Sequence, residues 1–401
     1  MRLLWVKAGK ILPVDTGGKI RSYNLARQLA SRHELTFLSY YDGAPDESYE
    51  REVARVFPGS VTLRTGAPTS GFVAQGAHYL RRFPSSAPYA VSKFTVPEVA
   101  GFVTRGMREQ RYDAMICDFL SASLNFPRSL TTPSVLFQHN VESALWDRQA
   151  RHEANPLKRL VFELEAKKMV RYERHAVRRF HHVIAVSEHD RSLMSEMTDP
   201  TRISVVPTGV DLSLYRAARG APPEKPLVLF LGSMDWEANI DGVDWFCRDI
   251  WPTVLATVPD AKFRIVGRNP HARVRKLESA SVEVTGTVPS VIEHLQEAAV
   301  FVVPLRIGGG TRLKIFEAMA TGRACVSTSV GAEGLDVTHG TNILLEDEAE
   351  GFAKSVIRLL RDRAERARFA HAAGDLAARY DWSVIVATFE ASLEQARSTA
   401  A

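Results

Sequence analysis

Three consecutive glycines stand between an expected strand and an expected helix, close to several cations. The glycines are Gly308, Gly309 and Gly310, and the cations are Arg306, Arg312 and Lys314. A glycine run lets the backbone approach a ligand closely and point several N–H groups toward it. The helix is expected to begin at about Thr311, which can cap it, and an exposed helix N-terminus favours an anion. The segment therefore predicts a diphosphate site, with a plain strand-to-helix turn as the alternative.

A carboxylate lies deeper on the same expected helix. Glu317 follows Lys314 by three residues, and its oxygens can accept two hydroxyl hydrogen bonds, such as those of a ribose 2′,3′-diol. The alternative is an exposed helix charge neutralised by neighbouring Lys or Arg. No Lys-Ser or Lys-Thr follows the glycines, which makes a P-loop nucleotidase an unlikely class.

A second glycine pair, Gly17 and Gly18, follows the first expected strand and opens a helix. The pair allows the backbone to approach a ligand, and Lys19 or Arg21 shortly after it could meet a phosphate. Two glycines before a helix are also common in an ordinary turn, and that alternative stays open.

Two polar residues end expected strands in the first half of the chain. His139 follows the strand 134–137, and Asp118 follows the strand 114–117. Ligands of open α/β sheets bind beyond the carboxyl ends of the strands, so both positions suit a binding site. We expect Asp118 to contact an acceptor or to cap a turn, and a structural role is the alternative for His139.

Apolar runs bounded by turn residues alternate with helical patterns along the whole chain. In the first half the expected strands are 3–6, 35–38, 61–63, 114–117, 134–137, 183–186 and 203–206. In the second half they are 227–231, 262–266, 282–285, 300–303, 324–327 and 342–345. The expected helices include 19–31, 97–108, 242–255, 291–296, 312–320 and 350–361. This alternation is typical of βαβ units and parallel sheets covered on both faces.

Two such series divide the chain. At 401 residues the chain exceeds the roughly 250–300 at which a single hydrophobic core stops growing. The first series ends at Pro207–Asp211, and a Pro/Gly-rich linker, 218–226, precedes the second. We therefore predict an α/β protein of two doubly wound domains, 1–212 and 213–381, that face each other across a cleft.

The composition excludes several classes of protein. Hydrophobic residues make up 45% and charged residues 24%, which is ordinary for a globular protein and excludes disorder. Three widely spaced cysteines argue against a disulfide framework and for a reducing compartment. No apolar run reaches the ~18 residues of a membrane span, and the N-terminal apolar run is too short for a signal peptide. The sequence predicts a cytoplasmic protein without zinc-type ligand spacing or a nucleic-acid-binding module.

Basic residues are concentrated in Arg151–His182, where their excess over Glu equals the formal net charge of the whole chain, +5. We expect this stretch to form one long helix. A solvated helix face with Glu–Lys and Glu–Arg pairs is one interpretation. The other is contact with anionic lipid at the inner face of the membrane, or with a polyprenyl-diphosphate acceptor.

The second half of the chain resembles the glycosyltransferase group 1 family, whose members are retaining enzymes of the GT-B fold. Segment 308–317 resembles the donor-site helix of one branch of that family, with its Gly-Gly-Gly-Thr-Arg-Leu-Lys sequence. Leu231–Trp236 and Ile265–Arg268 resemble the family's first two C-domain turns, and 284–288 resembles the stretch that cradles the nucleotide base. Val205–Asp211 resembles the interdomain signature, with Thr208 where Asn is usual.

The resemblance implies roles for individual residues. Glu317 holds the donor ribose, the glycine segment and nearby cations hold the diphosphate, and a histidine at the place of His139 lies against the donor sugar. Residues implied in donor binding also include Ser233, Arg268, Thr287 and Val288. The chain departs from the family at Gly309, where many members have a second glutamate, and lacks the usual Arg and Lys after the first C-domain strand. We infer that Arg306, Arg312 and Lys314 take over the latter role.

Together, the residues and the resemblance predict a retaining glycosyltransferase. It would move a sugar from a nucleotide-diphosphate donor to a hydroxyl of a glycan, glycolipid or polyprenyl-diphosphate-linked acceptor in polysaccharide or glycoconjugate biosynthesis. The expected catalytic residues are His139, Arg306 and Lys314, acting on the leaving diphosphate mainly by electrostatics and without a metal or other cofactor. In the family the last segment, here 382–401, returns as a helix to the N-terminal acceptor-side domain. The alternatives are a nucleotide-sugar 2-epimerase of the same fold and a catalytically silent scaffold that binds nucleotide sugar.

Overall fold

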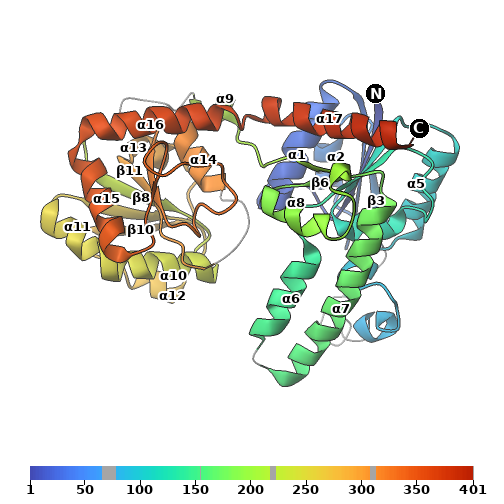
Figure 1. The fold of residues 1–401 in the computed structure, drawn as a ribbon, viewed down its shortest axis with the longest axis horizontal. Helices are drawn as coiled ribbons and strands as arrows, with labels where there is room; N and C mark the ends of the chain where they lie inside the picture. Colours follow the sequence, from blue (N-terminus) through green and yellow to red (C-terminus); the bar gives the residue numbers. More distant parts are fainter. Residues whose placement is uncertain (66–77, 154, 217–222, 308–312, 401) are drawn as a thin grey trace. The chain divides into compact units, whose positions relative to one another are not determined.

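The computed structural model describes residues 1–65, 78–153, 155–216, 223–307 and 313–400. The chain forms two compact units (Figure 1). The first unit comprises Met1–Pro207 and Ile385–Ala401, and the second comprises Thr208–Val384. The sequence placed the corresponding divisions at 212/213 and at 381/382. The chain thus passes from the first unit to the second and returns.

The first unit contains a parallel sheet of seven strands in the order β3-β2-β1-β4-β5-β6-β7. Its strands are β1 (Arg2–Ala8), β2 (Glu34–Asp42), β3 (Val61–Thr65), β4 (Ala114–Asp118), β5 (Ser134–Phe137), β6 (His182–Ala185) and β7 (Ile203–Val205). Each strand overlaps one of the predicted apolar runs, which confirms the expectation of a parallel sheet in this half. The order shows that the chain starts in the middle of the sheet and builds outward in both directions.

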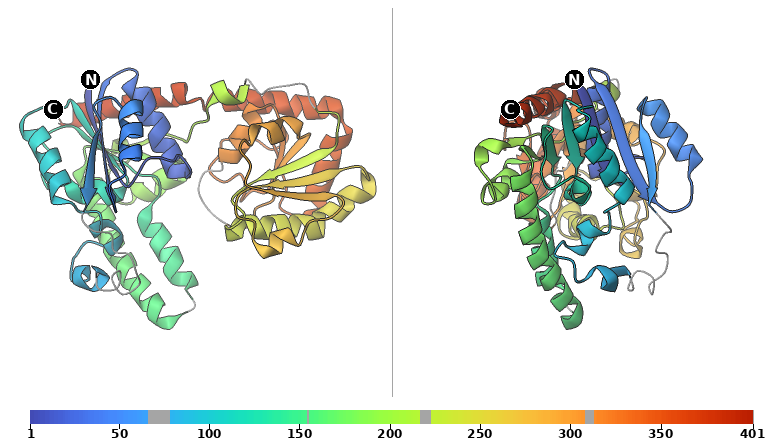
Figure 2. Two further views of the ribbon diagram at one scale, coloured as in Figure 1. Left: turned by 180° about the vertical axis from the view of Figure 1, so that it is seen from behind. Right: turned by 90° about the vertical axis from the view of Figure 1, so that its right-hand side faces the viewer.

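Helices cover both faces of this sheet, as Figure 2 shows. They are α1 (Gly17–Ala30), α2 (Glu47–Val56), α4 (Tyr89–Ser92), α5 (Pro97–Arg108), α6 (Glu142–His152), α7 (Pro156–Arg179), α8 (Glu188–Ser195) and α17 (Trp382–Ala400). On one face of β1, the Trp5 ring stacks on Phe389 of α17 with centroids 5.6 Å apart. On the other face, Leu4 belongs to a core cluster with Val103 of α5 and Met169 of α7. Both faces of β1 are therefore buried, which explains its continuous apolar sequence.

The second unit contains a parallel sheet of six strands in the order β10-β9-β8-β11-β12-β13. Its strands are β8 (Leu227–Leu231), β9 (Lys262–Val266), β10 (Val282–Gly286), β11 (Val300–Val303), β12 (Ala324–Ser327) and β13 (Leu344–Leu345). All six overlap predicted runs. The helices are α9 (Leu212–Arg216), α10 (Glu237–Trp245), α11 (Trp251–Thr257), α12 (Ala272–Arg275), α13 (Ile292–Glu297), α14 (Leu313–Ala320), α15 (Ala349–Arg361) and α16 (Arg363–Ala378).

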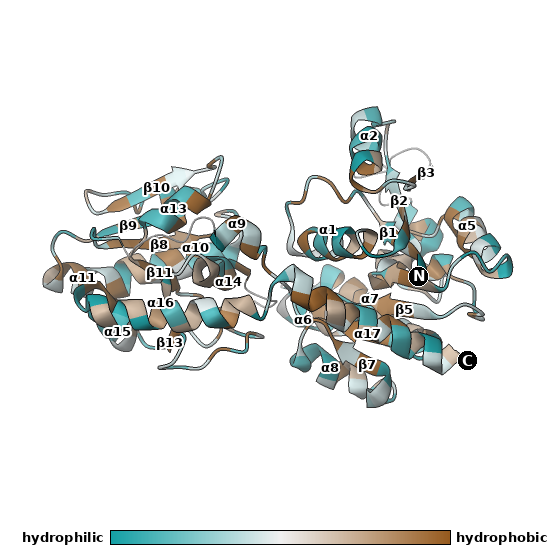
Figure 3. Cartoon of the chain, turned by 90° about the horizontal axis from the view of Figure 1, so that it is seen from above, coloured by the Kyte–Doolittle hydropathy of each residue, from teal (hydrophilic) through white to brown (hydrophobic). Residues whose placement is uncertain are grey.

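Some helix predictions need correction. The helix expected at 242–255 is α10 and α11 joined through a π-helical turn, Phe246–Ile250, and α16 was not predicted. The hydropathy view in Figure 3 shows α17 carrying both hydrophobic and hydrophilic residues, in keeping with a helix that packs on a sheet by one face.

The prediction of one long helix over Arg151–His182 is wrong. The stretch contains the end of α6, a turn, all of α7 and the first residue of β6. The break has a local cause, because the Asn155 side chain accepts hydrogen bonds from the backbone N–H groups of Leu157 and Lys158. Pro156 is the first residue of α7, where its missing N–H does no harm. Asn155 and Pro156 therefore start a new helix that packs beside α6 as a hairpin (Figure 1).

Candidate active site

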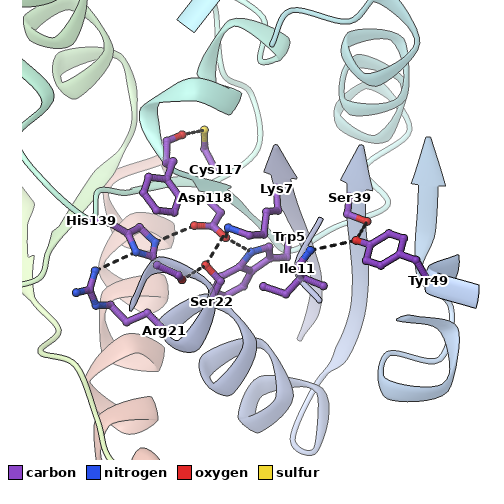
Figure 4. A network of polar contacts seen from close by, with 12 residues as sticks. Trp5, Lys7, Ile11, Arg21, Ser22, Ser39, Tyr49, Cys117, Asp118 and His139 are labelled. Carbon is purple, nitrogen blue, oxygen red and sulfur yellow. Dashed lines mark hydrogen bonds and ion pairs between the residues drawn. The ribbon is translucent and has the colours of Figure 1, made fainter. Parts of the chain in front are cut away.

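The buried side chain of Asp118 accepts hydrogen bonds from three polar groups at the C-terminal ends of the strands of the first sheet. Asp118 ends β4 and is fully buried. One of its oxygens accepts hydrogen bonds from Nε1 of Trp5 and from Nζ of Lys7, each 3.0 Å away, and the other lies 2.8 Å from Nε2 of His139 (Figure 4). Lys7 and Asp118 are register partners in neighbouring strands, which brings the two charges together. Burial opposes ionisation, but the Lys7 charge and the His139 hydrogen bond hold the pKa of Asp118 well below its usual range.

The imidazole of His139 is neutral and has a defined tautomer. Burial lowers the pKa of His139 to about 3, and the charges of Arg21 and Lys7 act in the same direction against the attraction of Asp118. Because an ionised Asp118 only accepts, Nε2 of His139 must carry the proton. Nδ1 is then the acceptor for the Arg21 guanidinium, whose NH1 lies 3.0 Å away. Both ring nitrogens of His139 are therefore engaged within the first unit.

Aromatic packing encloses the same imidazole. The ring of Phe119 stacks on His139 with centroids 3.7 Å apart and planes 6° from parallel. Phe119 adopts φ 68°, in the left-handed region that a bulky residue rarely enters. A Cβ on Gly18 would lie 2.7 Å from the Phe119 ring, so Gly18 is explained by the packing of α1 on this ring. A Cβ on Gly17 would meet no other described heavy atom within 4 Å.

These contacts define the surroundings of two predicted site residues, Asp118 and His139. Asp118, predicted to contact an acceptor or to cap a turn, is fully buried, and its two oxygens accept hydrogen bonds from Trp5, Lys7 and His139. His139, predicted to be catalytic with a structural role as the alternative, is 2% exposed, and both of its ring nitrogens are hydrogen-bonded. Asp118, His139 and Arg21 thus form one buried chain of hydrogen bonds in the first unit. Burial lowers the pKa of Arg21 to about 10, which leaves its guanidinium charged at neutral pH.

In the second unit, two strand ends meet at the carboxyl edge of the sheet. A Cβ on Gly267, after β9, would lie 1.6 Å from the carbonyl oxygen of Gly232, after β8, so only glycine fits at 267. Arg268 donates from Nε to the Ser233 hydroxyl at 2.8 Å. The predicted donor residues Ser233 and Arg268 are therefore in direct contact.

Lys314 reaches the same place from α14. Its Nζ donates to Oδ1 of Asn239 at 3.1 Å, lies 4.3 Å from the centre of the Phe230 ring, and is 2.9 Å from where a Cβ on Gly232 would be. Gly232 therefore leaves room for an ammonium group that comes from 82 residues further along the chain. Lys314 and Arg268 together place two cations around Gly232 and Ser233, a suitable environment for an anionic ligand.

Arg306 has a different environment. Its guanidinium donates twice to the Asp241 carboxylate, at 3.1 and 2.6 Å, and lies 5.3 Å from the Trp245 ring. The Asp241 hydrogen bond raises the pKa of Arg306. The positive charge of Arg306 is therefore matched by a carboxylate on α10, which makes Arg306 a weaker candidate for the diphosphate than Lys314 or Arg268.

Glu317 lies on α14 one turn after Lys314, and it is partly buried. Its Oε1 accepts a hydrogen bond of 2.9 Å from the Tyr215 hydroxyl. Burial raises the pKa of Glu317, and the Tyr215 hydrogen bond and the Lys314 charge act against this rise. The carboxylate predicted to hold a ribose is therefore fixed at one oxygen by a residue of α9.

The remaining predicted donor residues fall into two groups. Thr287 and Val288 follow β10 at the same edge as Arg268; Thr287 is exposed and Val288 packs partly against the core. Residues 308–312 lie outside the described residues, so the structure does not place Gly308, Gly309, Gly310, Thr311 or Arg312.

Sequence reasoning did not single out Lys7 or Tyr215. A lysine inside the apolar strand Arg2–Ala8 was an available signal, because a buried ammonium needs an anionic partner. Tyr215 gave no comparable signal, because its partner is 102 residues away in the sequence.

Two family models match the chain. Residues 16–214 match the model described as Glycosyltransferase Family 4, and residues 225–362 match the model described as Glycosyl transferases group 1. The chain therefore contains a Glycosyltransferase Family 4 domain followed by a Glycosyl transferases group 1 domain. Both models describe transferases, so they do not favour the 2-epimerase alternative.

The chain matches curated relatives over part of their length. An uncharacterised 44.6 kDa protein in the cps region of Klebsiella pneumoniae is 30% identical over 139 residues, 32% of this chain and 36% of the relative. Phosphatidyl-myo-inositol mannosyltransferase of Mycolicibacterium smegmatis is 29% identical over 214 residues, 51% of this chain and 54% of the relative. The chain thus spans about a third to a half of the relatives that it matches.

Solved structures of low sequence identity show the same fold as this chain. Anabaena Alr3699/HepE, crystallised with UDP and glucose, superposes with a TM-score of 0.65 at 16% identity, covering 98% of this chain and 99% of that one. TarM superposes with a TM-score of 0.69 at 10% identity, covering 98% and 99%. Two Rossmann-like domains of this kind constitute the GT-B fold, which confirms the predicted fold class.

Within the described residues, no helix is long and apolar enough to cross a membrane. The same residues contain no group of three or more His, Cys, Asp or Glu side chains that could hold a metal ion.

Proposed function

We propose that the chain is a retaining glycosyltransferase that moves a sugar from a nucleotide-diphosphate donor to a hydroxyl of a glycan or glycolipid. The observation that carries the proposal is the meeting of Lys314 and Arg268 at Gly232 and Ser233, at the carboxyl edge of the second sheet. HepE, a protein of the same fold, was crystallised with UDP and with UDP-glucose, and this supports a nucleotide-sugar donor.

In this proposal the second unit binds the donor. Lys314 and Arg268 hold the diphosphate, together with the segment Gly308–Arg312, which we assign to the Gly-Gly-Gly-Thr-Arg-Leu-Lys branch on its sequence. Glu317 binds the ribose, and Thr287 and Val288 lie beside the base. The cations stabilise the charge that grows on the leaving diphosphate, so the proposed reaction proceeds without a metal ion or other cofactor.

We propose an acceptor at a membrane surface, approached from the cytoplasmic side. The hairpin helix α7 exposes three leucines on one face near its start, Leu157, Leu160 and Leu164, with exposures of 77%, 55% and 38%. At helical spacing, the same face continues with the exposed arginines Arg171, Arg174 and Arg178. An apolar end with a basic continuation suits anionic lipid headgroups. The mycobacterial relatives, named as phosphatidyl-myo-inositol mannosyltransferases, support a glycolipid acceptor.

Donor turnover tests the proposed function. Purified protein would be incubated with UDP-, GDP-, ADP- and dTDP-sugars without acceptor, and release of nucleoside diphosphate would be measured. We expect slow hydrolysis of one donor, and loss of both hydrolysis and nucleotide affinity in Lys314→Ala. Lys354→Ala, which removes a surface lysine of α15 paired with Glu350, is the matched control and should behave as wild type.

Calorimetry on the same panel separates the remaining outcomes. Tight binding of a nucleotide sugar, without turnover even when lipid and glycan acceptors are added, would establish the silent scaffold instead. Absence of binding to every donor would exclude the nucleotide-sugar site.

A further inference from the structure

A tyrosine from a neighbouring helix holds the carboxylate of Glu317: Tyr215 Oη donates a hydrogen bond of 2.9 Å to Oε1 of Glu317. Tyr215 is 7% exposed and comes from α9, whereas Glu317 comes from α14, which packs against α9. Burial and the neighbouring Glu317 charge raise the pKa of Tyr215 well above its usual range. The hydroxyl therefore keeps its proton and acts as the donor.

The position of Tyr215 is itself fixed by the backbone around it. Oδ1 of Asp211 accepts from the backbone N–H of Leu214 at 3.2 Å, and Oδ2 of Asp381 accepts from the N–H of Leu212 at 3.2 Å. Val210 donates to the Tyr380 carbonyl oxygen at 2.7 Å and pairs with Asp381 as a short parallel bridge. Two carboxylates thus fix the backbone at the start of the short helix α9. Because this backbone is fixed, the Tyr215 side chain has a defined position beside α14.

Without this hydroxyl, Glu317 would have a competing partner on its own helix. Lys314 precedes Glu317 by three residues, a spacing at which opposite charges attract each other. The neutral Tyr215 hydroxyl, which comes from another helix, holds one oxygen of Glu317 and leaves the negative charge of Glu317 in place. Since an ionised carboxylate has about four lone-pair sites, one hydroxyl donor leaves capacity for two further hydroxyls.

We infer that Tyr215 is a positioning residue that orients Glu317 to accept the hydroxyls of a ribose, and that it thereby sets the preference of the chain for ribonucleotides over 2′-deoxyribonucleotides. The inference rests on the proposed function, because it concerns the donor site of the second unit. Tyr215 contributes through Glu317, and its own ring is buried in the core of that unit.

The test compares ribonucleotides with their 2′-deoxy counterparts. Affinities for UDP, 2′-deoxy-UDP, GDP and 2′-deoxy-GDP would be measured by calorimetry on the full chain. Wild type should bind the preferred ribonucleotide about tenfold or more tightly than its 2′-deoxy form, as expected for a hydrogen bond to a charged group. In Tyr215→Phe the ribonucleotide should bind about tenfold more weakly, while the affinity for the 2′-deoxy form changes by less than about twofold.

Tyr380→Phe is the matched control. Tyr380 stacks on Phe316, the neighbour of Glu317 on α14, with centroids 4.2 Å apart, so this variant changes the same surroundings without touching the carboxylate. It should keep the ribose preference of wild type. In a Glu317→Gln background, Tyr215→Phe should cause little further loss of affinity, because the group that it positions is gone.

The outcomes distinguish the two proposals. Equal weakening of ribo- and deoxyribonucleotide binding in Tyr215→Phe would show that Tyr215 is only structural and would overturn the inference. A wild type that binds both forms equally would also overturn it, while leaving the donor site in place. Failure of wild type to bind any nucleotide would overturn the proposed function as well.

Discussion

His139 donates a hydrogen bond from Nε2 to Asp118, with 2.8 Å between the two atoms, and this bond determines which nitrogen of the imidazole faces Arg21. A carboxylate that stays ionised can only accept, so Nδ1 of His139 is left as an acceptor for a guanidinium. The hydrogen bond to Asp118 thus fixes the His139 tautomer, and this tautomer lets the neutral ring accept a hydrogen bond from Arg21. Four polar side chains, those of Lys7, Asp118, His139 and Arg21, are buried together in this way.

Replacing Asp118 by Asn should destabilise the first unit strongly. The change leaves the buried Lys7 ammonium without its anion and removes the acceptor that fixes the His139 tautomer. Breaking a buried pair costs about 3–5 kcal/mol, which urea unfolding would measure as a lower free energy of unfolding. Asp113→Asn is the control, because Asp113 pairs with Arg2 at the surface and its loss should cost about 0–1 kcal/mol. Equal losses in the two variants would contradict this account.

Stability should depend on pH through His139. An unfolded histidine binds a proton below about pH 6.5, whereas the pKa of His139 in the fold is lowered to about 3. Between these values the unfolded state binds more protons, so His139 lowers stability as the pH falls, by at most about 1.4 kcal/mol per unit. Gln in place of His139 does not titrate, so the urea-unfolding free energy of His139→Gln should fall less steeply from pH 7 to 4.5. Parallel curves for wild type and variant would exclude the effect.

The two glycines that open α1 should respond differently to alanine. A methyl group on Gly18 would lie 2.7 Å from the Phe119 ring and would disturb its stack on His139, at a cost of about 1–3 kcal/mol. A methyl group on Gly17 meets open space among the described residues, so Gly17→Ala should unfold at a urea concentration close to that of wild type. If Gly17→Ala nevertheless lost donor turnover at unchanged stability, we would conclude that Gly17 lets the backbone approach the substrate closely. Equal destabilisation would contradict the packing explanation of Gly18.

The exposed leucines of α7 should mediate binding to anionic membranes. Replacing Leu157 and Leu160 by Gln removes two apolar side chains, each able to contribute about 1.5–3 kcal/mol on full burial. We expect co-sedimentation with phosphatidylglycerol vesicles to fall at least about tenfold, with little binding of either protein to phosphatidylcholine vesicles. Leu214→Gln, which changes a half-exposed leucine of the second unit, is the control and should bind as wild type. Unchanged sedimentation of the double variant would remove this face of α7 from the membrane proposal.

Much of the fold could be predicted from local sequence patterns. Strands buried on both faces are continuous apolar runs, and for this reason runs such as Ala114–Cys117 and Val300–Val303 identify β4 and β11. A different pattern gave a wrong prediction: the charge composition of Arg151–His182 suggested one long helix, but the stretch contains parts of two helices and a turn. The dipeptide Asn155-Pro156, a cap followed by a helix-starting proline, contained the signal for a break.

The candidate site was less predictable, because its contacts join residues far apart in the sequence. Spacing places Lys314 and Glu317 on one helix, but it does not show that Lys314 reaches Asn239 or that Glu317 meets Tyr215. Burial was also invisible in the sequence. Asp118 and His139 lie at the ends of their strands, at the expected edge of the sheet, yet packing encloses both side chains, which the sequence did not indicate.

The stacking of Phe389 on Trp5 has a consequence for the order of folding. Trp5 lies in β1, among the earliest residues to be synthesised, whereas Phe389 belongs to α17 and is added only after the whole second unit. During synthesis the first sheet must therefore leave an apolar face uncovered while 177 residues of another unit, Thr208–Val384, are made. The first unit to begin folding is thus the last to be completed, and a nascent chain that stalls before α17 presents a hydrophobic surface that a chaperone can recognise.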